Sequence, residues 1–132
     1  MKNSLINIPR IENFKGDIFK ILKSSDKEFK GFGEIYISYV KKGEIKAWKK
    51  HLKMTCILIP ISGQTKVVVY DNIDFHVFNL NSEEKKKLII PPHTIFGFSA
   101  IKDDSSIMNI ANIEHDPKES INYDLQEFNY EW

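Results

Sequence analysis

The sequence is poor in several residues whose abundance marks particular protein classes. It has one cysteine, Cys56, with five prolines and six glycines in 132 residues. A lone cysteine excludes an intramolecular disulfide framework, and its place in the apolar run 56–59 predicts a buried structural thiol in a reducing cytoplasm. No window approaches the roughly 18 apolar residues of a membrane-spanning helix. We therefore expect a soluble, unprocessed cytoplasmic protein with no membrane partner.

Charge of one sign is not in excess either. Lys and Arg number 19 against 18 Asp and Glu, which gives a net charge of +1. Such a balance provides no long-range attraction for nucleic acid, and the basic residues are spread along the chain, so no nucleic-acid partner is expected. The length predicts one domain over residues 1–132 that is large enough to bury a core.

Helical signals are scarce, and alternation of apolar and polar residues dominates. Only residues 25–29 carry a signal for a helical turn, and the tail 117–132 has no clear assignment. Polar turns or prolines separate short runs rich in β-branched and aromatic residues at 34–40, 44–51, 54–61, 65–70, 74–80, 88–90, 95–100 and 106–113. Short strands with turns at close spacing predict an antiparallel sandwich or barrel.

Several short motifs follow one another in a fixed order. Ser38 and residues 43–46 (Gly-Glu-Ile-Lys) precede residues 67–71 (Val-Val-Val-Tyr-Asp) and 90–98 (Ile-Pro-Pro-His-Thr-Ile-Phe-Gly-Phe). In order and spacing they resemble motifs of the dTDP-4-dehydrorhamnose 3,5-epimerase family. A sister family, the dTDP-4-keto-6-deoxyhexose 3,4-ketoisomerases, is similar in length, and its pocket motif Arg-Gly-x-His-Ala-His falls on residues 46–51.

The resemblance implies a fold and a reaction. The fold is an all-β cupin jelly roll, an antiparallel double-stranded β-helix barrel, in a homodimer with residues 5–19 as a candidate for strand exchange. The substrate is a nucleotide-linked 4-keto-6-deoxy sugar of cell-surface polysaccharide biosynthesis, and no cofactor is expected. Both families remove a proton from a carbon next to the ketone, which requires a base, a group that stabilises the enolate oxygen, and an acid.

The residues at the implied catalytic positions differ from the family patterns. Lys49 stands where the epimerases have their histidine base, and Lys46 stands where they have an arginine that polarises the ketone. A lysine is ordinarily protonated at neutral pH and is a poor base. We therefore predict His51, which matches the last histidine of the ketoisomerase motif, as the base, with Lys49 as the second catalytic residue.

Other parts of the implied machinery have no counterpart at their usual places. The family's pocket lysine falls near Cys56 and its pocket tyrosine near Asn109. The aspartate that supports the epimerase histidine belongs to a C-terminal extension beyond the position of Trp132. The sequence thus predicts neither a phenolic acid nor a supporting carboxylate at these positions. Contacts to the substrate are predicted at Lys46, Ser38, Asn109 and His115.

The orientation of the pocket strand follows from alternation. Strict alternation places His51 on one face with Lys49 and Ala47, and Trp48 on the other. Under a plainer interpretation, His51 is a strand residue hydrogen-bonded to a neighbour, and Trp48 is more typical of a core than of a sugar platform. His93, after two prolines, is interpreted as a loop histidine on the surface or at the mouth of the barrel.

A metal is not expected. Metal-binding cupins supply His-x-His, then Glu, and a further His from a later strand. Here the first pair is Lys49-x-His51, no glutamate follows before Gly63, and the later position is Phe96. One ligand out of four does not make a metal site.

The favoured hypothesis is an isomerase or epimerase, because Lys46, Lys49 and His51 keep the pocket strand polar. The first alternative is a non-catalytic cupin that binds a carbohydrate or sugar nucleotide but has lost the acid and base. The second is a partner protein of a larger complex, whose barrel interior would be filled by side chains.

Overall fold

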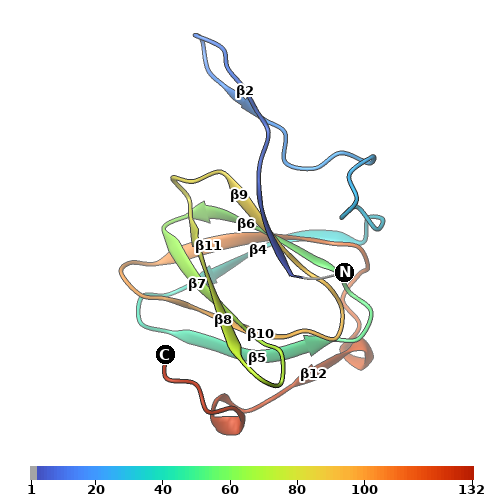
Figure 1. Ribbon diagram of the computed structural model, residues 1–132, viewed down its shortest axis with the longest axis vertical. Helices are drawn as coiled ribbons and strands as arrows, with labels where there is room; N and C mark the ends of the chain where they lie inside the picture. Colours follow the sequence, from blue (N-terminus) through green and yellow to red (C-terminus); the bar gives the residue numbers. More distant parts are fainter. Residues whose placement is uncertain (1–2) are drawn as a thin grey trace.

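The computed structural model describes residues 3–132, and its regular secondary structure consists almost entirely of β-strands (Figure 1). Two single-turn 3₁₀ helices, η1 (Pro117–Glu119) and η2 (Leu125–Glu127), follow the last long strand, and no α-helix occurs in this range. Residues 25–29 form turns. The strands are β1 (Ser4–Asn7), β2 (Arg10–Ile11), β3 (Ile18–Phe19), β4 (Glu34–Val40), β5 (Ile45–His51), β6 (Cys56–Ser62), β7 (Gln64–Tyr70), β8 (Phe75–Asn81), β9 (Lys86–Ile90), β10 (Ile95–Ala100), β11 (Ser105–Ala111) and β12 (Ser120–Asn122).

Two five-stranded antiparallel sheets form the body. One has the strand order β1-β9-β6-β11-β4 and the other β12-β5-β10-β7-β8. Between them lies a core that takes Leu58 from β6, Val67 from β7, Leu88 from β9 and Ile107 from β11. This arrangement confirms the predicted cupin-type jelly roll.

The first five residues of β6, residues 56–60, are all apolar because both faces of the strand are buried there. Cys56 and Leu58 point into the core between the sheets. Ile57 and Ile59 point outward, where the N-terminal segment covers them with Ile6, Ile8, Phe19, Ile21 and Leu22. The N-terminal segment therefore supplies a second, outer core against this sheet.

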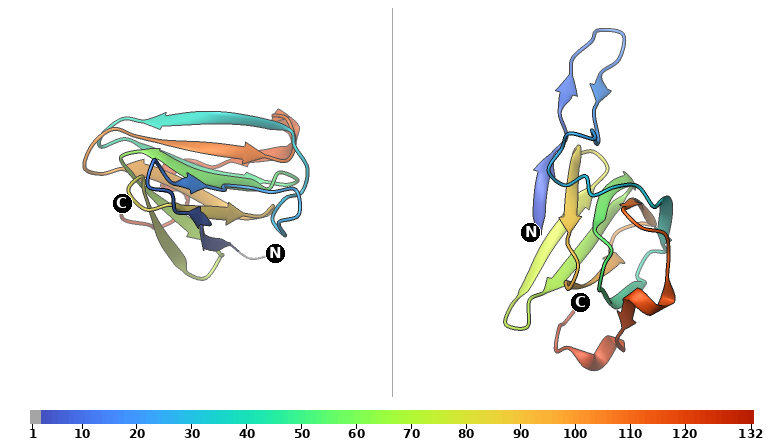
Figure 2. Two further views of the ribbon diagram at one scale, coloured as in Figure 1. Left: turned by 90° about the horizontal axis from the view of Figure 1, so that it is seen from above. Right: turned by 90° about the vertical axis from the view of Figure 1, so that its right-hand side faces the viewer.

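The N-terminal segment is attached at two places. Strand β1 pairs with β9 of its own chain. Further on, the buried Lys87 forms an ion pair with Glu28 at 2.5 Å and donates to the carbonyl of Ile21. Between these attachments the β2–β3 hairpin extends away from the body, and Phe14 at its turn is 95% exposed (Figure 2).

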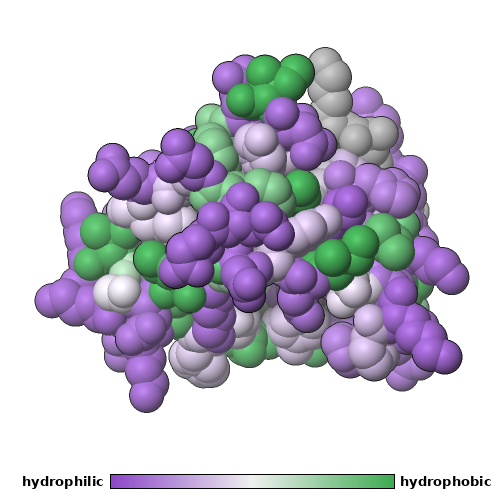
Figure 3. All heavy atoms as spheres, turned by 90° about the horizontal axis from the view of Figure 1, so that it is seen from below, coloured by the Kyte–Doolittle hydropathy of each residue, from purple (hydrophilic) through white to green (hydrophobic). Residues whose placement is uncertain are grey.

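The surface is mixed in character. The face shown in Figure 3 is mostly hydrophilic, with hydrophobic residues in small separate patches. Within residues 3–132 no helix has the length and apolar character needed to cross a membrane.

Candidate active site

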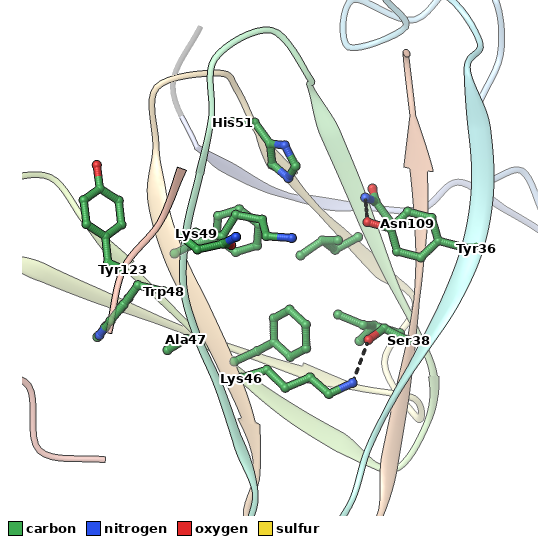
Figure 4. Close-up of a pocket in the computed structure, with 14 residues that line it drawn as sticks. Tyr36, Ser38, Lys46, Ala47, Trp48, Lys49, His51, Asn109 and Tyr123 are labelled. Atoms are coloured by element: carbon green, nitrogen blue, oxygen red, sulfur yellow. Dashed lines mark hydrogen bonds between the residues drawn. The ribbon is translucent and has the colours of Figure 1, made fainter. Parts of the chain in front are cut away.

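The polar face of β5 is produced by an irregularity in its pairing with β10. Phe96 lies opposite Lys49, whereas Phe98 lies opposite Lys46, so β5 has one more residue than β10 between these two pairs. A bulge of this kind lets residues three apart share a face. Lys46, Lys49 and His51 consequently all point into one cavity (Figure 4).

The close approach of β10 to this bulge requires a glycine. A Cβ atom on Gly97 would lie 2.4 Å from the Cβ of Ala47, well inside van der Waals contact. Gly97, a residue of the sequence motif, therefore shapes the pocket strand without touching a ligand.

The cavity lies between the two sheets and has a volume of about 480 Å³. Its apolar wall consists of Leu58, Phe96, Phe98 and Ile107. Polar groups enter from β4, β5 and β11. An apolar chamber with a few convergent polar groups is the usual form of a small-molecule site, and the open volume argues against a barrel filled by its own side chains.

His51 forms a buried pair with Glu119. The imidazole Nδ1 lies 2.5 Å from Glu119 Oε1, and the two residues are 5% and 2% exposed. The other carboxylate oxygen, Oε2, accepts the backbone N–H groups of Lys53 at 3.1 Å and Met54 at 3.2 Å. The supporting carboxylate, absent from the position that the resemblance implies, is therefore supplied by Glu119 from another part of the chain.

Glu119 reaches His51 because of the strand that follows it. Strand β12 pairs with β5, and its first residue, Ser120, lies opposite His51. The preceding turn η1 is held by Asp116, whose side chain accepts the N–H of Lys118. The carboxylate thus comes from the unassigned tail of the sequence, where short polar segments gave no pairing signal.

The pair fixes the protonation of both groups. Burial opposes ionisation of Glu119, but the hydrogen bonds from His51, Lys53 and Met54 outweigh it and lower the pKa of this carboxyl group. Because an ionised carboxylate only accepts hydrogen bonds, Nδ1 of His51 carries a proton. In a neutral imidazole the lone pair is then on Nε2, which is the atom left to act as a base.

A phenol also lines the cavity. Tyr36 on β4 accepts a hydrogen bond at 2.9 Å from Nδ2 of Asn109, a buried residue of β11. Burial raises the pKa of Tyr36, so its hydroxyl stays protonated. With one of its lone pairs already used, its proton is free to be donated to a bound molecule. The resemblance implied a phenol only near residue 109, where this chain has Asn109 instead. Alternation of Tyr36 with Ser38 on one face of β4 could have indicated this phenol.

The remaining polar groups occupy different parts of the cavity. Lys46 Nζ donates to the carbonyl of Tyr39 at 2.6 Å and to Ser38 Oγ at 3.3 Å, which joins β5 to β4 (Figure 4). Lys49 points into the space between His51 and Tyr36, and no hydrogen bond or ion pair to its Nζ is present among residues 3–132. Burial raises the pKa of the nearby Cys56 thiol to about 12, so this thiol stays neutral.

A family model described as FdtA, WxcM-like, C-terminal, matches residues 1–131. The chain belongs to this family. The fold is also that of solved sugar-nucleotide enzymes, although no curated protein matches the chain. A dTDP sugar isomerase from Desulfovibrio desulfuricans G20 is 28% identical, with a TM-score of 0.83 over 95% of this chain and 85% of that chain.

Two more distant structures share the fold. The QdtA 3,4-ketoisomerase from Thermoanaerobacterium thermosaccharolyticum, a double mutant in complex with TDP, has 20% identity and a TM-score of 0.80 over 92% of this chain and 87% of that one. A dTDP-4-dehydrorhamnose 3,5-epimerase from Sulfolobus tokodaii has 19% identity and a TM-score of 0.82 over 97% and 80%. The resemblance inferred from the motifs is confirmed.

In this WxcM-like chain, five of the six residues predicted for the site line one cavity: Ser38, Lys46, Lys49, His51 and Asn109. His115 is not among the lining residues. It follows β11 in an exposed segment, where its backbone N–H donates to Glu34 Oε1 at 2.6 Å. Trp48 borders the cavity, but its ring points to the opposite face of β5 and packs in an aromatic cluster there, as alternation predicted.

The donor set does not suit a metal ion. In the part of the chain that the structure describes, no group of three or more His, Cys, Asp or Glu side chains could hold one. His51 has Glu119 as its partner, and Lys46 and Lys49 place positive charge in the same cavity. The site is arranged to bind anionic or oxygen-rich molecules.

Proposed function

We propose that this protein is a sugar-nucleotide isomerase that abstracts the proton next to the ketone of a nucleotide-linked 4-keto-6-deoxy sugar. The observation that carries the proposal is the buried His51–Glu119 pair at the wall of an otherwise apolar cavity. A carboxylate that orients an imidazole and stabilises its protonated form is the arrangement that general-base catalysis uses.

The first step takes the proton from C3 to Nε2 of His51. The electron pair of the C–H bond moves into the C3–C4 bond, and the C4 carbonyl becomes an enolate oxygen. Lys49 Nζ, which points into the same space (Figure 4), would stabilise the negative charge on that oxygen. Glu119 offsets the positive charge that His51 gains.

The second step returns the proton. Delivery to C4, with transfer of the C3 hydroxyl proton to the C4 oxygen, moves the ketone from C4 to C3 and leaves a hydroxyl group on C4. Delivery to the other face of C3 inverts that carbon instead. A single base adjoining both carbons suits the first outcome, because it can take and return a proton on one face. The protonated Tyr36 would donate a hydrogen bond to a sugar oxygen during either step.

Solvent isotope exchange tests the proposal. Wild-type protein incubated in D₂O with dTDP-4-keto-6-deoxyglucose is expected to introduce deuterium into the sugar, and the position of the label and of the ketone separates isomerisation from epimerisation. His51→Asn should slow exchange by roughly 10²–10⁴-fold, the usual contribution of a general base. His76→Asn is the matched control, since His76 pairs with Asp71 in an exposed position.

Binding separates the enzyme from a carbohydrate-binding cupin. Wild-type protein that binds dTDP by calorimetry but leaves every substrate proton unexchanged over a panel of 4-keto sugar nucleotides would establish the non-catalytic alternative. Absence of binding as well as exchange would contradict both assignments.

We also propose that the protein is a homodimer that uses its N-terminal hairpin. The support is the hairpin's projection from the body, with Ile11, Phe14 and Ile18 each at least 45% exposed. Apolar side chains at such a position favour a partner surface. Light scattering over a range of concentrations tests this proposal, and Phe14→Ser should shift the mass toward the monomer.

A further inference from the structure

A second cavity lies at the end of the barrel, outside the His51–Glu119 pair. Its volume is about 690 Å³. It is open to solvent and is bordered by the β9–β10 turn, by residues 52–55 after β5, and by Lys30 and Asn112. It shares no lining residue with the catalytic cavity.

Three exposed basic residues from three different segments line this cavity: Lys30, Lys53 and His93. None of the described residues that line it is acidic. Across residues 3–132 no ion pair or hydrogen bond is recorded for Lys30 Nζ, Lys53 Nζ or the ring of His93. These donors are therefore available for a ligand.

Asn112 adds a neutral donor to the set. Its Oδ1 accepts the N–H of Thr55 at 2.7 Å. This bond fixes the amide with Nδ2 as its free end, and an amide nitrogen can only donate. Two ammonium groups, an imidazole and an amide make a combination that fits an anion with several oxygens better than a carboxylate with two.

His93 occupies a backbone conformation that side chains other than glycine rarely adopt. Its φ is +66°. A residue with a Cβ in the left-handed region carries a conformational cost that glycine avoids. His93 is held there by its own N–H, which donates to the carbonyl of His51 at 2.6 Å. A histidine maintained at this cost points to a use for its side chain.

The segment after β5 serves both cavities. The N–H of Lys53 donates to Glu119 Oε2, while the side chain of Lys53 lines the second cavity. The neighbouring residue also contacts Glu119, since the backbone N–H of Leu52 donates to the backbone carbonyl of Glu119 at 2.6 Å. A ligand that moves Lys53 would therefore alter the hydrogen bonds that hold the catalytic pair.

We propose that this cavity binds the phosphate group of a small anion and that its occupancy is transmitted to the His51–Glu119 pair through residues 52–55. Leu52, Pro91 and Pro92 border the same cavity and would contact an organic group attached to the phosphate. A phosphate monoester with an organic part is therefore the preferred ligand. The proposal does not depend on which reaction the catalytic cavity performs.

Titrations observed by nuclear magnetic resonance test the site in the full chain. Inorganic phosphate, glucose 1-phosphate and acetate are added separately while the backbone amides of Lys53 and Asn112 and the ring of His93 are followed. Saturable shifts are expected for both phosphates, with affinity on the order of 1 mM or tighter, and tighter binding for the monoester. If inorganic phosphate binds equally well, the free ion is the ligand. Acetate should bind weakly.

Variants locate the anion. Lys53→Met should weaken phosphate binding about tenfold, the effect of losing one charge-assisted contact. His93→Gly suits its backbone conformation and should fold normally while losing several-fold in affinity. Lys102→Met removes a charge from an exposed turn, and Asn72→Gly relieves the other non-glycine residue with positive φ, at 74°. These two controls should bind as wild type does.

The outcomes are decisive in both directions. No saturable shift at tens of millimolar phosphate, or equal weakening by Lys53→Met and Lys102→Met, would overturn the site. The downfield proton signal of the His51–Glu119 hydrogen bond reports the coupling. It should shift on phosphate addition in wild type and stay in place in Lys53→Met, and a bound phosphate that leaves it unmoved would contradict the coupling.

Discussion

The two faces of β5 differ in what they contact and in what they contribute. On one face Lys46, Lys49 and His51 line a cavity that is open to a ligand. On the other, Trp48 is 2% exposed and packs against Phe75, Phe128, Tyr130 and Trp132 with ring-centroid distances of 5.2–6.2 Å. One strand therefore holds the chemistry on one side and the packing that fixes it on the other.

The difference explains how a divergent pocket can keep its scaffold. The C-terminal tail folds over the outer face, where Trp48 Nε1 donates to the carbonyl of Leu125 at 3.1 Å. Its first part carries Glu119 to the inner face by pairing β12 with β5. Because the aromatic packing around Trp48 involves none of Lys46, Lys49 and His51, replacements at these three positions leave the packing side intact.

The largest expected effect is a loss of stability on the packed face. Trp48→Ala should lower the free energy of unfolding by about 3–5 kcal/mol, as for other buried aromatic truncations. Chemical denaturation followed by circular dichroism measures it. Trp132→Phe is the control, since the indole Nε1 of Trp132 is buried without a hydrogen-bond partner in the described structure, and its removal should cost little. Equal losses in the two variants would contradict the central place of Trp48 in the packed face.

Glu119→Gln should affect both faces, because this residue joins the tail to the pocket. A glutamine has one acceptor oxygen, so its NH₂ group must face either His51 Nδ1–H or the N–H groups of Lys53 and Met54. Leaving buried donors unpaired costs about 1–3 kcal/mol. Deuterium exchange into the substrate should also fall, by roughly 10²-fold, since the base loses its orientation.

Glu34→Gln is the matched control for that change. Its amide oxygen can still accept the N–H of His115, so neither stability nor exchange should change. An unaltered exchange rate in Glu119→Gln would remove the carboxylate from the mechanism.

The ionisation of Glu119 should also make the difference in free energy of unfolding between wild type and Glu119→Gln depend on pH, which is a smaller effect. Its pKa in the folded protein is lowered from 4.5. The stabilisation that ionised Glu119 gives the folded protein is therefore complete above the pKa that Glu119 has in the unfolded chain. It is lost as the pH falls through the pKa that Glu119 has in the folded protein. The free energy of unfolding of wild type should exceed that of Glu119→Gln near neutral pH, and the gap should narrow below about pH 4.5.

Asp17, Asp26 and Asp71 also have lowered pKa values, and hydrogen bonds from backbone N–H groups are the main cause in each case. These three aspartates titrate in wild type and in Glu119→Gln alike. Their contribution therefore cancels in the difference in free energy of unfolding between the two proteins. A gap that stays constant with pH would show that Glu119 is not an ionised partner of His51.

Much of the fold could be predicted, because each strand has a local pattern of apolar and polar residues that does not depend on its partner. The turn at Gly43, with φ of +81°, and the apolar run of β6 are examples. The strands on either side of that turn, β4 and β5, would be expected to pair as a hairpin, but they lie in different sheets. The side of β5 that Trp48 occupies followed from alternation. The inward position of Lys46 could not be predicted from alternation, because the bulge opposite Gly97 depends on a partner strand about fifty residues away.

The site could be predicted only in part, for the same reason. The site residues of the pocket strand β5 could be predicted because they lie within a few positions of one another in the sequence. Glu119 was missed since it reaches His51 across 68 positions of sequence through a three-residue strand. His115 was placed with the pocket on resemblance, whereas the chain turns outward after β11 and leaves it exposed.

The smallest expected effect on stability belongs to Lys46, on the ligand face. Lys46 is exposed, and its two hydrogen bonds go to groups at the edge strand β4. Lys46→Met should therefore change the free energy of unfolding by no more than about 0.5 kcal/mol, the usual range for surface substitutions. If Lys46 binds the diphosphate, dTDP affinity measured by calorimetry should nevertheless fall about tenfold. Lys50→Met is the control, because it removes the same charge from a residue of β5 that does not line the cavity. This variant should bind dTDP as wild type does. Equal losses of affinity in the two variants would mean that general charge, and not the ligand face of β5, attracts the nucleotide.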